Sequence, residues 1–139
     1  MNLTRLSTLE RHRYSFFGIL SGLIAYIVLG SISLFLLRSC WADYAMASKD
    51  KSYTTGMLFS RLFVAIISSV FAGMVATKIS GDKGRIACFA GLIIFCIASY
   101  IHFFKVWDDY PLWYHLSYLV PIIPVTTLSH YFISKKLFG

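Results

Sequence analysis

Four long blocks of apolar residues dominate the chain and are separated by short polar segments. They cover about 14–37, 56–77, 86–104 and 112–133. A helix needs about 20 apolar residues to cross a hydrocarbon core roughly 30 Å thick, and each block is about that long. The apolar residues run continuously, whereas the strands of a membrane barrel alternate apolar and polar residues. The pattern therefore predicts an all-α, polytopic membrane protein, with a bundle of four transmembrane helices in a single domain over residues 1–139.

The composition supports a membrane protein. The chain is 58% hydrophobic and only 14% charged, and its mean hydropathy is +0.69. Soluble domains carry about 25% charged residues because their whole surface faces water. The first block could be mistaken for a secretory signal, but it exceeds the roughly 7–15 apolar residues of such a segment. We therefore expect it to remain as a membrane helix.

Basic residues are distributed unequally between the two sides that four helices define, and short loops rich in Lys and Arg stay in the cytoplasm. Eight basic residues lie on the side of the termini and second loop, namely Arg5, Arg11, Arg13, Lys78, Lys83, Arg85, Lys135 and Lys136. Four lie on the opposite side, namely Arg38, Lys49, Lys51 and Lys105. We therefore expect both termini to be cytoplasmic, in a bacterial inner membrane. The net charge of +7 then reflects topology and contact with anionic lipid, and no nucleic-acid partner is expected.

Aromatic residues flank the first and third loops, as is typical of rings that settle at a membrane surface. They are Trp41, Tyr44, Trp107, Tyr110, Trp113 and Tyr114.

Small residues recur at four-residue spacing in three of the predicted helices, and such faces allow close packing of helices in lipid. They could pack the bundle internally, which we favour, or dock another subunit. The fourth predicted helix contains Pro121 and Pro124, each of which lacks a backbone donor, so a kink is expected there. The small residues are Gly18, Gly22, Ala65, Ser69, Gly73, Ala87 and Gly91.

Arg61 is the one basic residue inside the second apolar block, and charge at that depth usually pairs, reaches the surface or lines a wet cavity. Asp108 and Asp109 lie in the loop on the same side of the bundle. We expect an ion pair between Arg61 and this loop. The alternatives are that Arg61 extends to the lipid headgroups or binds a substrate anion.

His102 and His115 lie near the ends of consecutive antiparallel helices, which could bring them together. Two such histidines could bind a divalent metal or a b-type haem. The simpler interpretation is that both hydrogen-bond to backbone or headgroups at the interface. No carboxylate lies inside the four blocks, and no phosphate-loop or H-E-x-x-H motif is present. No cofactor and no catalytic residue are therefore predicted.

The run DDYPLWYH over 108–115 leads into a last helix that contains proline, and small residues precede Lys78 in the second. With a short tail and four helices, this order resembles a class of small bacterial four-helix inner-membrane proteins of unknown function. The resemblance covers most of the chain. It implies the four-helix fold and no particular activity.

These observations favour a non-catalytic membrane protein that acts through helix–helix contacts. Its partners would be the lipid bilayer and other membrane subunits or a second copy of itself, and it would serve as an accessory or assembly subunit of a larger complex. A small oligomeric transporter or channel is the alternative, which would be favoured if Arg61, His102 and the proline kink lined one cavity. A haem- or metal-binding redox protein is the third possibility.

Overall fold

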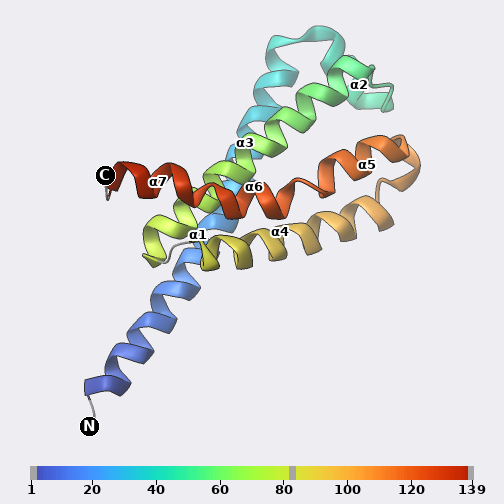
Figure 1. The fold of residues 1–139 in the computed structure, drawn as a ribbon. Coiled ribbons are helices and arrows are strands. Elements are labelled where there is room, and N and C mark those ends of the chain that lie inside the picture. The colour runs from blue at the N-terminus through green and yellow to red at the C-terminus, as the bar shows by residue number, and fades with distance from the viewer. Residues whose placement is uncertain (1–2, 82–83, 138–139) are drawn as a thin grey trace.

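The computed structural model describes residues 3–81 and 84–137, and the regular structure in those ranges is entirely helical (Figure 1). Lys83, one of the basic residues counted above, lies outside the described residues. The elements are α1 (Leu3–Cys40), α2 (Ala42–Asp50), α3 (Thr55–Ser80), α4 (Arg85–Phe104), the short 3-10 helix η1 (Trp107–Asp109), α5 (Leu112–Leu119), α6 (Ile122–Leu128) and α7 (His130–Leu137).

Four stretches of the described residues are long and apolar enough to cross a membrane. They are Ser7–Cys40, Thr55–Ser80, Arg85–Phe104 and Leu112–Ile133. Each contains one of the blocks predicted from the hydrophobic pattern, so the prediction of four long apolar helices is confirmed.

The chain runs back and forth between two ends of the bundle. One end carries α2, the beginning of α3 and the turn through η1 between α4 and α5, and we call it the α2 end (Figure 1). The N-terminal part of α1 extends beyond the other helices at the opposite end. Neither α2 nor η1 was predicted. Tyr44 and Ala47, which are three residues apart and so share one face of α2, are buried.

The predicted small-residue faces lie at contacts between helices of this chain. A Cβ atom on Gly18 or Gly22 of α1 would lie only 2.8 or 2.9 Å from backbone oxygens of α3. A Cβ on Gly73 would collide with Thr126 of α6, and one on Gly91 would lie 3.1 Å from the Thr126 Cβ. These glycines therefore allow α3 to approach α1 and α6, and α4 to approach α6. The remaining small residues, Ala65, Ser69 and Ala87, are buried.

The fourth span is broken into three helices. α5 ends at Leu119 and α6 begins at Ile122, so the first break lies at Pro121, whose missing N–H interrupts the helical ladder. Pro124 lies in the first turn of α6, where a helix does not need that donor. Pro124 also lacks the N–H that would donate to the carbonyl of Val120 one turn back, so both prolines lie at this break. A second interruption at Ser129 separates α6 from α7.

Candidate functional site

Arg61 lies in the second turn of α3, at the α2 end, and is enclosed by tyrosines. Its Nε donates to the Tyr114 hydroxyl at 3.1 Å, and its Nη1 donates to the hydroxyls of Tyr44 at 3.1 Å and Tyr53 at 3.2 Å. The guanidinium carbon also lies 5.0 Å from the centre of the Tyr53 ring and 5.4 Å from that of Tyr110. We call these four residues the tyrosine cage.

The cage stabilises the positive charge of Arg61 through the dipoles of its hydroxyl groups and the faces of its aromatic rings. Phenolic oxygens accept the guanidinium hydrogens, while the negative faces of two rings attract the charge. Burial of Tyr110 raises the pKa of its phenol, although the charge of Arg61 acts in the opposite direction. Tyr110 therefore stays neutral at physiological pH, and its contribution to binding Arg61 is its ring face.

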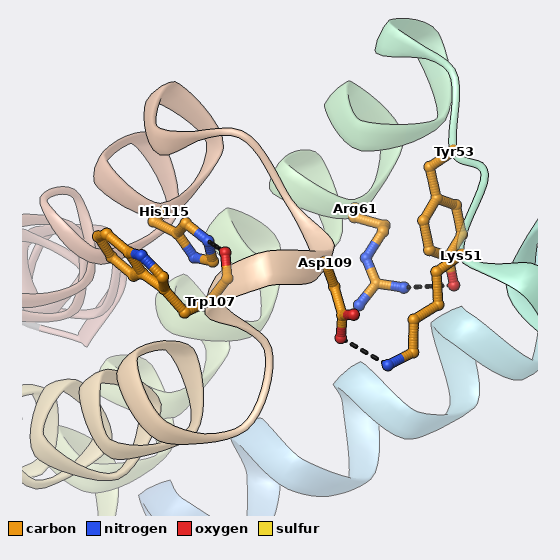
Figure 2. Close-up of polar contacts among 6 residues, drawn as sticks. All are labelled: Lys51, Tyr53, Arg61, Trp107, Asp109 and His115. Carbon is orange, nitrogen blue, oxygen red and sulfur yellow. Dashed lines mark hydrogen bonds and ion pairs between the residues drawn. The ribbon is translucent and has the colours of Figure 1, made fainter.

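Arg61 was expected to form an ion pair with the Asp108–Asp109 loop, but its hydrogen bonds go to tyrosine hydroxyls instead. Asp109 instead accepts from the Lys51 ammonium at 2.6 Å (Figure 2). Asp108 is exposed. The difference arises because the loop between α2 and α3 places Lys51 over η1 and turns Tyr53 toward Arg61 (Figure 2). Tyr44, Tyr110 and Tyr114 were visible in the sequence only as interface aromatics, and Tyr53 was not singled out. The available signal was the number of tyrosines in the two loops on the same side of the bundle as the half-buried Arg61.

The structure brings His102 of α4 and His115 of α5 into direct contact. Their Nδ1 atoms lie 2.7 Å apart, and both side chains are buried. The Nε2 atom of His115 lies 3.1 Å from the backbone carbonyl oxygen of Trp107 (Figure 2). The Trp107 ring stacks on His115 with ring centres 4.9 Å apart, and Tyr118 packs on His102 at 4.4 Å. The aromatic contacts therefore hold both imidazoles in fixed orientations.

The hydrogen-bond partners determine where the protons lie on the two rings. A carbonyl oxygen only accepts, so the His115 Nε2 carries a hydrogen and donates to Trp107. A neutral imidazole carries one hydrogen, so with that hydrogen on Nε2 the His115 Nδ1 is the acceptor. His102 must then donate from Nδ1, and its Nε2 is left without a hydrogen. No hydrogen bond among the described residues occupies that Nε2.

The spacing of the histidines favours a hydrogen bond over a shared metal ion. Two imidazoles at about 2.05 Å from one tetrahedral zinc keep their nitrogens roughly 3.3 Å apart, whereas these lie at 2.7 Å. Within the described residues, no group of three or more His, Cys, Asp or Glu side chains is placed to bind a metal. Metal binding at this pair would require its hydrogen bond to open.

A cavity of about 260 Å³ lies beside the histidines, between α1, α4 and α5, and we call it the lateral cavity. The α4 residues at its floor are buried, with Ala98 8% and His102 7% exposed, whereas Ile27 and Ile97 at its rim are 60% and 50% exposed. It therefore opens onto the apolar side of the bundle. Its lining consists of Leu23, Tyr26, Ile27, Ile94, Ile97, Ala98, Ile101, His102 and Tyr118.

A smaller cavity of about 50 Å³ lies between α1 and α3 and is lined by Arg61 and Ser68. Tyr26 and Tyr118 line both cavities and separate them, with their hydroxyls hydrogen-bonded at 2.9 Å. Arg61 and His102 therefore face neighbouring cavities that share one wall. The prolines of the broken helix line neither cavity.

No protein-family model, curated protein or solved structure matches the chain. The resemblance to small bacterial inner-membrane proteins therefore stays a prediction.

Proposed function

We propose that this chain is a non-catalytic, four-span protein of a bacterial inner membrane that binds a small lipophilic molecule from the bilayer. The four long apolar helices and the excess of basic residues on the side of the termini support membrane insertion with both termini in the cytoplasm. In that orientation the tyrosine cage lies near the outer surface. The lateral cavity then opens into the hydrocarbon of the bilayer.

The lateral cavity is the observation that carries the proposal. Ligand sites are concave and mostly apolar, with a few polar groups that fix orientation, and they often lie between the helices of bundles. Here isoleucines make up much of the lining, and its polar residues are His102, Tyr26 and Tyr118. A volume of about 260 Å³ lies just below the roughly 300–1,000 Å³ of typical ligand pockets, so the ligand or its head group is small.

Photolabelling of the purified protein in lipid nanodiscs tests this function. A short alkyl diazirine with a terminal hydroxyl should label peptides of α4 and α5 that contain Ile97, Ile101 or Tyr118, at a saturable level. Ala98→Phe places a ring in the cavity and should abolish that labelling. Leu92→Phe adds the same ring to an exposed position of α4 that does not line the cavity, and labelling should persist. Unsaturable labelling spread over all four spans would refute the proposal.

A second candidate is the accessory subunit expected from the sequence, and the exposure of α1 favours it. Only 6% of the most apolar window of the first span is buried, compared with 39% in the second and third spans. Most of α1 is thus available to lipid or to another membrane protein. Mild extraction of the native protein should then recover defined partner proteins at a constant ratio. Recovery of the chain alone or as a homo-oligomer would count against this role.

A further inference from the structure

The hydrogen-bond chain that ends at His102 selects the chemical class of ligand in the lateral cavity. Trp107 accepts from His115, and His115 accepts from His102, which leaves the Nε2 of His102, a residue that lines the cavity, as a bare acceptor. Neutral imidazole has no further hydrogen to give. A ligand that reaches this nitrogen must therefore bring a hydrogen-bond donor.

The tyrosines on the same wall add the complementary requirement. Tyr26 and Tyr118 share one hydrogen bond between their hydroxyls, so one of the two hydrogens is used and the other remains available. The wall thus presents one acceptor on His102 and one donor on the tyrosine pair. A hydroxyl group is the smallest group that donates and accepts at once, whereas an ether or ketone only accepts.

Resting on the proposed function, we propose that the lateral cavity binds lipophilic molecules that carry a hydroxyl group, with the hydroxyl donating to His102 and the apolar part lying against the isoleucines of α1 and α4. Aliphatic alcohols and alkyl phenols share this chemistry. An ammonium group also donates, but it would bring charge into an apolar cavity and could not accept from the tyrosine pair.

Competition against the photoprobe by pairs of compounds that differ only in the hydroxyl group separates the contribution of the hydroxyl to binding from that of the apolar part. 1-Octanol is compared with its methyl ether, and 4-butylphenol with 4-butylanisole, after correction of each concentration for partitioning into the nanodisc. A bound ether would leave the buried Nε2 of His102 without a hydrogen-bond donor. Each ether should therefore compete about tenfold less strongly, or weaker still, than its matching hydroxyl compound. A preference in the first pair identifies an aliphatic alcohol as ligand, and a preference in the second identifies a phenol.

His102→Phe keeps a ring of similar size and should remove the preference while both members of a pair still compete. If that variant does not fold, the nitrogen NMR signal of the unprotonated His102 Nε2 in the wild-type protein gives the same information. It should move on addition of the hydroxyl compound and stay in place with the ether. Equal competition by alcohol and ether would overturn this inference while leaving the lateral cavity as a binding site. Failure of all four compounds to compete would overturn the proposed function as well.

Discussion

Replacing Tyr114 with phenylalanine removes one acceptor from the tyrosine cage while leaving the ring in place. The Tyr114 hydroxyl is the acceptor for Nε of Arg61, at 3.1 Å, and the side chain is 1% exposed. Hydrogen bonds to charged groups contribute about 1.5–3 kcal/mol in soluble proteins, whereas hydrogen bonds between membrane helices average about 0.6 kcal/mol. We expect Tyr114→Phe to lower the free energy of unfolding by about 1–2 kcal/mol, because the donor is charged and Nε is left without its partner.

The same substitution at Tyr53 should cost less, below about 1 kcal/mol, because Nη1 still donates to Tyr44. Unfolding in mixed micelles of increasing SDS content, followed by tryptophan fluorescence, measures these differences. Tyr100→Phe serves as the matched control, since this tyrosine is 58% exposed and lies outside the cage.

A double-mutant cycle isolates the contact between Arg61 and Tyr114. In an Arg61→Leu background, Tyr114→Phe should be close to neutral, because no guanidinium remains to bind the hydroxyl. The reasoning would be refuted if Tyr114→Phe cost as much in that background as in the wild type. It would also fail if Tyr114→Phe cost no more than Tyr100→Phe.

Three further predictions concern packing and the histidine pair. Thr126→Val should raise the free energy of unfolding by about 1 kcal/mol, measured in the same micelles, because the buried Thr126 hydroxyl has no hydrogen-bond partner among the described residues and valine has the same shape. Gly73→Ala should destabilise the protein by about 1–3 kcal/mol, because the added methyl group collides with α6. Gly56→Ala has open space around it and should stabilise α3 by up to about 1 kcal/mol. Equal effects of the two substitutions would contradict the close approach of α3 and α6. Nitrogen NMR should find the hydrogen on Nε2 of His115 and on Nδ1 of His102, and the reverse assignment would remove the basis for a donor ligand.

The hydrophobic pattern was sufficient to predict the four apolar helices, because continuous apolar blocks of that length have few other structures available. The break at Pro121 was also predictable, since proline removes a backbone donor wherever it occurs. The bounds of the break could not be predicted, because they depend on where the next helix begins, which is Ile122.

The partners of Arg61 could not be predicted from the sequence, for a different reason. A guanidinium can be satisfied by carboxylates, by phenols or by water, and the nearest carboxylates in the predicted topology were Asp108 and Asp109. The choice depends on α2, a short helix with no long hydrophobic pattern, which buries Tyr44 and brings Lys51 to η1 and Tyr53 to Arg61. Antiparallel adjacency alone indicated that the two histidines could meet, although separate bonds to backbone or headgroups were the simpler interpretation. Its direct hydrogen bond depends on ring orientations that only the packed aromatic residues define.

α5 links the cage, the histidine pair and the lateral cavity, because its side chains hydrogen-bond to each of the three long helices. Tyr114 accepts from Arg61 of α3, His115 bonds to His102 of α4, and Tyr118 bonds to Tyr26 of α1. The orientation of α5 is thus determined by polar contacts, whereas α6 is positioned by the close approach of Thr126 to glycines of α3 and α4. A continuous helix would have to satisfy both sets of contacts with one axis. The break at Pro121 allows α5 to align its three polar side chains while α6 keeps its tight crossing, so the proline has a structural role although it lines neither cavity.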